Sequence, residues 1–156
     1  MPLPFFVLSL GKEEVTIPMP TPPEFPLKVF YDGSCSVCAR EMEAYRGKEH
    51  EGRLLFVDIG APFFDPSPYG ISLNDLMYQM HAIDRAGRIY RGVEAFWAIW
   101  QAFPASTLYG FLGTLVTLPG VNLGARFAYR GFARIRKYLP RRRDACEGGS
   151  CRIDHR

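Results

Sequence analysis

Two cysteines three positions apart, Cys35 and Cys38, have the spacing of a dithiol that opens and closes a disulfide bond. They follow a short apolar run and precede a stretch with helical periodicity. A cysteine at the start of a helix is stabilised as a thiolate, because free backbone N–H groups and the helix dipole favour negative charge. We therefore expect Cys35 to be the attacking thiolate and Cys38, one turn further on the same face, to be the resolving thiol.

The same residues allow two other interpretations. The pair could be half of a zinc site completed by Cys146 and Cys151, or two inert buried thiols. However, four residues separate Cys146 from Cys151 in a Gly-rich tail, and a zinc knuckle normally lies in a turn rather than at a strand-to-helix junction. The context favours redox chemistry, and a small zinc-binding or interaction module with a basic docking helix remains the alternative.

The elements that must position the cysteines form a strand–helix–strand unit. Residues 27–31 are an apolar strand candidate, and Asp32-Gly33 ends it with turn chemistry. Ser34 is the predicted N-cap of a helix that ends near Gly47. A second strand is predicted over residues 54–58, and a helical crossover of this kind joins parallel strands.

The rest of the chain continues the alternation of strands and helices. The predicted elements are a short capped helix over 72–78, a β-hairpin over 80–84 and 88–90, and helices over 93–103, 106–118 and 121–139. This order indicates an α/β fold, a small mixed sheet flanked by helices with a C-terminal helical extension. Residues 95–125 contain no charged side chain, but prolines and glycines divide them into pieces shorter than a membrane span, so we expect buried helices.

Composition indicates one domain with an extension at each end. The 156 residues, 47% of them hydrophobic, are enough to bury a core without disulfide bonds. Residues 1–26 carry seven prolines and are predicted to be an extended N-terminal segment, residues 27–139 the domain, and residues 140–156 a flexible, basic tail with two cysteines. The N-terminus lacks the positive region of a secretory signal, and sparse cysteines do not suit a secreted scaffold, so we expect a cytoplasmic protein.

The segment Tyr31-Asp-Gly-Ser-Cys-Ser-Val-Cys38 resembles the signature of the DCC family of thiol-disulfide oxidoreductases, named for an Asp-Cys-Cys pattern. The resemblance extends over about residues 27–139 through downstream landmarks: Met80-His81, Asp84 to Gly87, Gly92 to Phe96, Trp100, Pro104, Pro119-Gly120, Tyr129-Arg130 and Arg136. It implies a thioredoxin-like fold and a reaction class rather than a substrate. Thioredoxin relatives carry a cis-proline opposite the CxxC, whereas residues 76–81 contain no proline, which leaves the zinc alternative open and argues against thioredoxin-like peptide docking.

Several residues around the cysteines are candidates for supporting roles. Asp32 either relays a proton to the leaving thiol of Cys38 as a general base or fixes the turn through bonds to backbone N–H groups. The turn role is favoured, and Asp32 is a secondary catalytic candidate. A lone histidine on a strand is more often structural than reactive. The expected substrate-binding residues are Tyr31, Ser34, Ser36, Val37 and His81.

The C-terminal part carries a strong positive charge. Between Arg126 and Arg143 there are eight Lys or Arg residues and no acid. Such a run can bind nucleic acid or an anionic membrane surface, but the net charge is only +3 and no nucleic-acid motif accompanies it, so a solvated basic face is favoured. The predicted helix has a basic side of Arg126, Arg130, Arg134 and Lys137 and an apolar side of Ala128, Phe132, Ile135 and Leu139.

The sequence therefore predicts dithiol–disulfide exchange with a disulfide- or dithiol-containing substrate and a partner reductase. Cys146 and Cys151 are expected to form a disulfide or to shuttle electrons to Cys35 and Cys38 as an auxiliary redox pair. No organic cofactor is implied, because no Gly-rich phosphate loop follows a strand, and no resident metal is expected.

Overall fold

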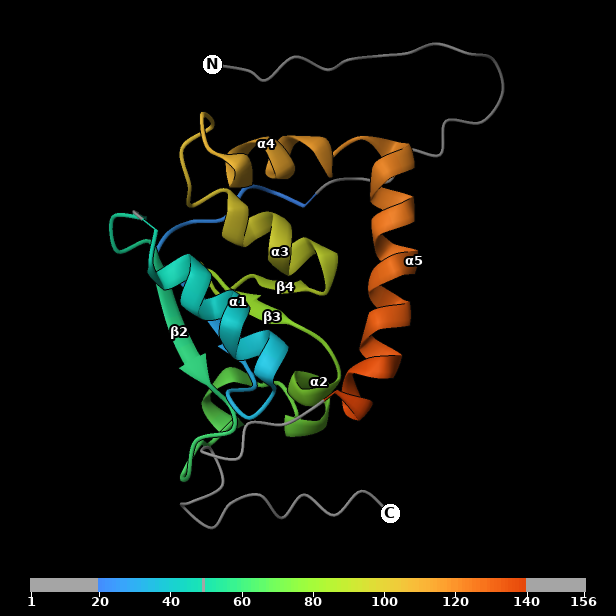
Figure 1. Cartoon of the computed structure of the whole chain (residues 1–156). Coiled ribbons are helices and arrows are strands. Elements are labelled where there is room, and N and C mark those ends of the chain that lie inside the picture. Colours follow the sequence, from blue (N-terminus) through green and yellow to red (C-terminus); the bar gives the residue numbers. More distant parts are fainter. Residues whose placement is uncertain (1–19, 49, 140–156) are drawn as a thin grey trace.

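The computed structural model describes residues 20–48 and 50–139, which form a small sheet with helices around it (Figure 1). The predicted order of strands and helices is confirmed. The elements are β1 (Leu27–Tyr31), α1 (Ser36–Arg46), β2 (Leu54–Asp58), η1 (Ser67–Tyr69), α2 (Leu73–Tyr78), β3 (His81–Ile83), β4 (Ile89–Arg91), α3 (Val93–Trp100), α4 (Leu108–Leu115), α5 (Pro119–Ile135) and η2 (Arg136–Tyr138).

The four strands form one mixed sheet in the order β2-β1-β3-β4. Strands β1 and β2 are parallel, as the helical crossover predicts, and Tyr31 pairs with Asp58 at their carboxyl ends. Strand β3 runs antiparallel to β1, so His81 at its start pairs with Phe30 near the end of β1. The carboxyl ends of β1 and β2 and the amino end of β3 therefore meet at one edge of the sheet, where the cysteine motif follows β1.

Side chains from alternate positions of β1 enter two separate apolar clusters. Leu27, Val29 and Tyr31 pack with side chains of α1 and α3 on one face. Phe30 points to the other face and packs with Ile59, Ile71 and Leu76, the last of which belongs to α2. The sheet is thus covered on both sides, which fits the predicted small mixed sheet flanked by helices and a thioredoxin-like arrangement.

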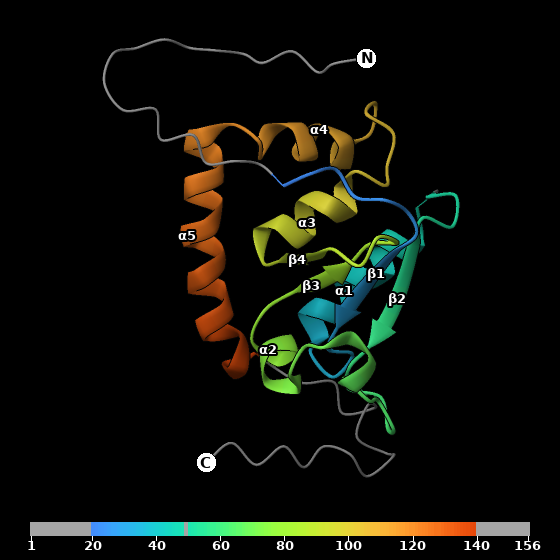
Figure 2. The same cartoon turned by 180° about the vertical axis from the view of Figure 1, so that it is seen from behind.

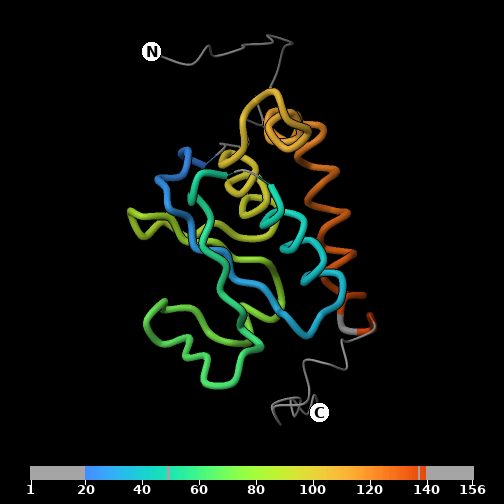
Figure 3. The backbone as a smooth tube through the Cα atoms, turned by 60° about the vertical axis from the view of Figure 1, so that its left-hand side comes forward, coloured from blue at the N-terminus to red at the C-terminus, as the bar shows by residue number. Residues whose placement is uncertain are grey.

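Helix α5 stands beside the sheet and runs from the end of α4 to α2 (Figures 1 and 2). Tyr129, near its middle, accepts the Met80 backbone N–H at 2.7 Å through its hydroxyl. Arg126 donates to the Glu94 carboxylate of α3 at 2.8 Å. These contacts fix the direction of α5, and its last turn reaches the turn that precedes α1 (Figure 3).

The predicted apolar and basic sides of α5 are wrong in detail. Ala128 is exposed and Ile135 is 56% exposed, while Arg126 is drawn into the ion pair with Glu94. The pattern failed because the packed side contains polar groups that are satisfied by hydrogen bonds, such as the Asn122 amide, which donates to the Val116 carbonyl. The residues on the packed side are Asn122, Ala125, Tyr129 and Phe132.

The expectation of buried helices over residues 95–125 holds for α3 only. Helix α3 contributes buried side chains to the core, but Leu108 and Phe111 of α4 are 68% and 59% exposed. Phe127, two residues beyond the uncharged stretch, is 63% exposed. Within the described residues, no single helix has the length and apolarity needed to cross a membrane; α4 and α5 meet these criteria only as a pair, and they bend by 103° where they join.

The Asp84 carboxylate holds the β3–β4 hairpin to the segment that precedes β1. It accepts the backbone N–H groups of Arg88 and Glu24 at 2.9 and 3.2 Å and the Arg88 side chain at 2.8 Å. The Tyr90 hydroxyl also donates to it. Although burial opposes ionisation, the bonds from Arg88 and Glu24 keep the pKa of Asp84 below its ordinary value of 3.8.

We predict that Asp84→Asn lowers the free energy of unfolding by about 2–4 kcal/mol, because an amide NH₂ cannot accept the bonds that one carboxylate oxygen receives. The stability that the charged Asp84 supplies is present above pH 3.8 and is lost as the pH falls through its lower folded pKa, so the two proteins should converge in acid. Urea unfolding at several pH values measures both effects. Glu51→Gln, which breaks an exposed ion pair with Arg53, is the control and should change stability by less than about 1 kcal/mol.

Candidate active site

Cys35 is the N-cap of α1, a role that the sequence pattern assigned to Ser34. The Cys35 backbone is extended, with φ of −80° and ψ of 114°, and its sulfur accepts the backbone N–H of Cys38 at 3.4 Å. Ser34 lies one residue too early to cap this helix, and its backbone N–H and hydroxyl both donate to the Asp32 carboxylate. The capping position places the Cys35 sulfur at the free N–H groups of the first helical turn, an environment that favours a thiolate.

The two sulfur atoms lie 2.8 Å apart as free thiols, and the Cys38 thiol donates a hydrogen bond to Cys35. This bond is the largest cause that lowers the pKa of Cys35 from 9.0 to about 6; burial opposes it, and the Cys38 backbone N–H and the Arg136 charge support it. The same bond, together with burial, raises the pKa of Cys38. At pH 7 a pKa of about 6 leaves roughly nine-tenths of Cys35 as thiolate, against about one-hundredth at 9.0.

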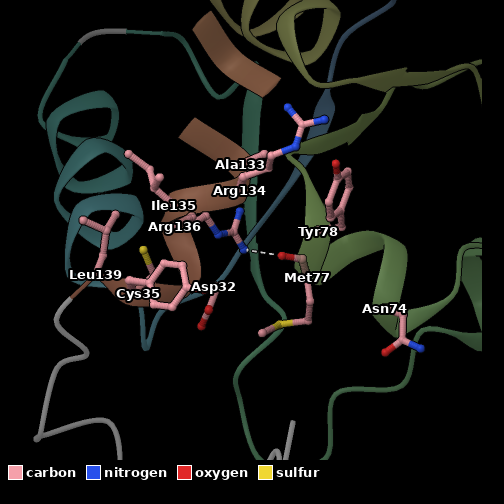
Figure 4. A pocket seen from close by; sticks show the side chains of 11 residues that line it. Asp32, Cys35, Asn74, Met77, Tyr78, Ala133, Arg134, Ile135, Arg136 and Leu139 are labelled. Atoms are coloured by element: carbon pink, nitrogen blue, oxygen red, sulfur yellow. Dashed lines mark hydrogen bonds between the residues drawn. The ribbon is translucent and has the colours of Figure 1, made fainter. Parts of the chain in front are cut away.

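Arg136 brings a positive charge to both sulfur atoms from the far end of the described chain. It lies just after α5, and its guanidinium donates to the Met77 carbonyl of α2 at 2.8 Å, the bond drawn in Figure 4. Its charge lowers the pKa of Cys35 and opposes the rise in the pKa of Cys38. Sequence analysis placed Arg136 among the family landmarks but missed it as a site residue, because only the packing of α5 brings it to α1.

A clamp at the ends of β1 and β2 sets the turn that presents Cys35. One oxygen of the Asp58 carboxylate accepts the backbone N–H groups of Gly33 and Gly60, each at 2.9 Å. The Asp32 carbonyl accepts the Cys35 N–H at 3.1 Å, which closes the turn. Asp32 therefore has the turn-fixing contacts that the sequence favoured. A side chain at Gly33 would collide with the Asp58 carboxylate, so the close approach requires glycine.

A pocket of about 840 Å³ opens beside Cys35, between α2 and the end of α5. Figure 4 shows the side chains that converge on it. Of the residues predicted for the site, Cys35 and Asp32 lie on its lining. The lining residues are Asp32, Cys35, Asn74, Met77, Tyr78, Ala133, Arg134, Ile135, Arg136, Tyr138 and Leu139.

The residues predicted to bind substrate lie around the motif but off this lining. Tyr31 is buried against α1, and its hydroxyl accepts a hydrogen bond from Arg46 at 2.8 Å. Ser36 and Val37 occupy the first turn of α1, and Val37 is 40% exposed.

His81 is buried in β3. One ring nitrogen lies 3.0 Å from the Gln79 carbonyl, and the other has no partner within the described residues. Burial lowers the pKa of His81. Because His81 pairs with Phe30, it faces the α2 side of the sheet, away from α1 and Cys38.

The zinc alternative involves residues beyond those that the structure describes. Among residues 20–48 and 50–139, no three His, Cys, Asp or Glu side chains are grouped in a way that could hold a metal ion. Cys146 and Cys151, the other half of that proposed site and the predicted auxiliary redox pair, lie outside the described residues.

We predict that Gly33→Ala destabilises the protein by about 2 kcal/mol and slows alkylation of Cys35, because the new methyl group displaces the Asp58 carboxylate from the turn. Urea unfolding and the rate of iodoacetamide modification measure the two effects. Gly52→Ala is a comparison outside the site: there a side chain meets no other atom within 4 Å, although φ is +71°, so stability should fall without an effect on Cys35. Normal Cys35 reactivity in Gly33→Ala would show that the clamp does not position the thiolate.

We predict that Arg136→Gln raises the pKa of Cys35, because the variant removes a positive charge that stabilises the thiolate. The pH dependence of the alkylation rate should therefore move to higher pH. Arg130→Gln removes the same charge from an exposed position of α5 that does not line the pocket, so its profile should match that of the unmodified protein. Equal shifts in both variants would mean that only the overall charge matters.

Comparisons with known proteins agree with the chemistry of this site. The family model described as DCC1-like thiol-disulfide oxidoreductase matches residues 29–142, a segment that includes both cysteines and Arg136. An Arabidopsis thaliana protein named "Uncharacterized protein At5g50100, chloroplastic" is 33% identical over 92 residues, which are 58% of this chain and 43% of the relative. The match thus spans less than half the length of that relative. No solved structure matches the chain.

Proposed function

Because the chain belongs to the DCC1-like thiol-disulfide oxidoreductase family, we propose that Cys35 and Cys38 carry out the family's thiol–disulfide exchange. The single observation that carries the proposal is the pair of sulfur atoms 2.8 Å apart at the N-terminus of α1, with one pKa lowered and the other raised. A low pKa suits an attacking thiolate, and a protonated neighbour within bonding range suits a resolving thiol.

In the reductive direction, the Cys35 thiolate attacks one sulfur of a substrate disulfide. A Cys35–substrate disulfide forms, the substrate disulfide breaks, and the other substrate sulfur leaves as a thiolate that takes a proton from solvent. Cys38 then loses its proton and attacks the Cys35 sulfur. This step forms the Cys35–Cys38 disulfide and releases the second substrate thiolate. A partner reductase with a dithiol returns the pair to the reduced state, and the reverse sequence oxidises a dithiol.

The hydrogen bond between the thiols supports this order of events. While Cys35 is a thiolate, it accepts a hydrogen bond from the Cys38 thiol and so holds Cys38 in the unreactive, protonated form. Once Cys35 is bonded to substrate, its negative charge is gone and the main cause of the raised pKa of Cys38 disappears with it. Asp32, which lies on the pocket lining and whose charge also acts on Cys38, is the candidate to accept the Cys38 proton through water.

We predict that Cys38→Ser traps a mixed disulfide at Cys35, because the resolving thiol is gone while the attacking sulfur remains. Mass spectrometry of the reduced variant after incubation with bis(2-hydroxyethyl) disulfide should show one mercaptoethanol adduct on Cys35. The matched variant Cys35→Ser keeps Cys38, whose raised pKa and burial should make its adduct form at least about tenfold more slowly. Equal adduct formation in the two variants would contradict the assigned roles.

A further inference from the structure

We propose that the pocket beside Cys35 selects disulfides that carry a carboxylate, with Arg134 as the residue that recognises it. The proposal rests on the proposed function, because the pocket is taken as the place where the disulfide meets Cys35. Thiol–disulfide exchange alone would accept any accessible disulfide, and the pocket narrows the substrates to those with a carboxylate.

Among the charged groups on the pocket lining, one cation has no anion of its own. Arg134 and Arg136 are positive, and Asp32 and the Cys35 thiolate are negative. Asp32 already accepts the N–H and the hydroxyl of Ser34 through one oxygen. Arg136 uses one of its donors on the Met77 carbonyl, and its charge acts on the cysteine sulfurs. Arg134 is the remaining cation, and it is available to a ligand.

Arg134 has no ion-pair partner among the described residues, although it is exposed and lies on a pocket wall. Acids pair with other arginines of the chain; for example, Arg126 pairs with Glu94 and Arg53 pairs with Glu51. No such compensation exists nearby in sequence, because no Asp or Glu occurs between Ala95 and Arg143. A guanidinium on the pocket wall that has no paired acid can attract an anionic ligand.

The arrangement of the groups indicates where the carboxylate binds. In Figure 4, Cys35 and Leu139 lie at one side of the pocket, the Arg136 guanidinium lies between them and Met77, and the Arg134 guanidinium lies on the side of Tyr78. When one sulfur of a bound disulfide lies at Cys35, the carboxylate of the same ligand molecule, several bonds from that sulfur, lies towards Arg134.

Apolar side chains line the space between these two ends. Ile135 and Tyr78 are more than half exposed, and Met77 and Leu139 complete the wall. Hydrocarbon between the reacting sulfur and the carboxylate can cover this wall and exclude water. A charge contact with a guanidinium is stronger where water is excluded, so the apolar wall and Arg134 favour the same ligands.

Three small disulfides that differ in charge test the proposal: 3,3′-dithiodipropionate, bis(2-hydroxyethyl) disulfide and cystamine are anionic, neutral and cationic at pH 7. The reduced full-length chain is mixed with an excess of each, and the loss of the Cys35 thiolate is followed by absorbance at 240 nm. Each rate is divided by the rate of the same disulfide with dithiothreitol, which removes intrinsic reactivity and the repulsion between a thiolate and an anion. We expect the normalised rate for the anion to exceed that for the neutral disulfide on the order of tenfold.

Three variants distinguish a specific contact with Arg134 from a general effect of positive charge. Arg134→Gln should lower the ratio of anionic to neutral rates several-fold, and Arg134→Lys should restore part of it. Arg130→Gln removes an equal charge one turn earlier on α5, off the pocket lining, and should keep the ratio. Equal normalised rates for the three disulfides, or equal losses in Arg134→Gln and Arg130→Gln, would overturn the carboxylate site while leaving disulfide exchange intact. Failure of all three disulfides to oxidise Cys35 would instead overturn the proposed function, and the inference with it.

Discussion

The proposed chemistry depends on one hydrogen bond, from the Cys38 thiol to the Cys35 sulfur across 2.8 Å. The bond makes two chemically identical side chains unequal, because the acceptor is stabilised as an anion and the donor is held as a neutral thiol. It exists because Cys35 is the N-cap of α1, which places the sulfur of residue 35 one turn below that of residue 38. A helix that began one residue earlier would turn the first sulfur away from the free N–H groups.

Two distant parts of the chain hold that geometry in place. On one side, the parallel pairing of β1 and β2 brings Asp58 beside Gly33, so the sheet register fixes the turn before α1. On the other side, α5 packs through Tyr129 and delivers Arg136 to the sulfurs and to Met77. The end of α5 and the residues that follow it are therefore part of the candidate active site. They supply one wall of the pocket and both of its arginines, Arg134 and Arg136.

The sequence predicts the order of elements well, since apolar runs and turn residues report directly on strands, helices and their crossovers. It misplaces the helix cap by one residue, because serine is a stronger capping residue than cysteine. Only the structure shows that Ser34 is hydrogen-bonded to the Asp32 carboxylate. It also misses Arg136 and Asp58, whose roles arise from tertiary packing. On α5, periodicity predicted that an apolar side packs on the domain and a basic side faces solvent. The side that packs instead includes the hydrogen-bonded polar residues Asn122 and Tyr129.

The most direct measurement of the central claim is the ionisation of Cys35 in the otherwise unaltered, reduced chain. Cysteine is labelled selectively with ¹³C at Cβ, and the Cys35 signal is assigned by its loss in the Cys35→Ser variant. The chemical shift of this Cβ as a function of pH then reports the ionisation of the Cys35 sulfur. The geometry at the start of α1 predicts a transition at about 6, with Cys38 still protonated well above neutral pH. A Cys35 transition near 9.0, the ordinary value for a free thiol, would contradict the account.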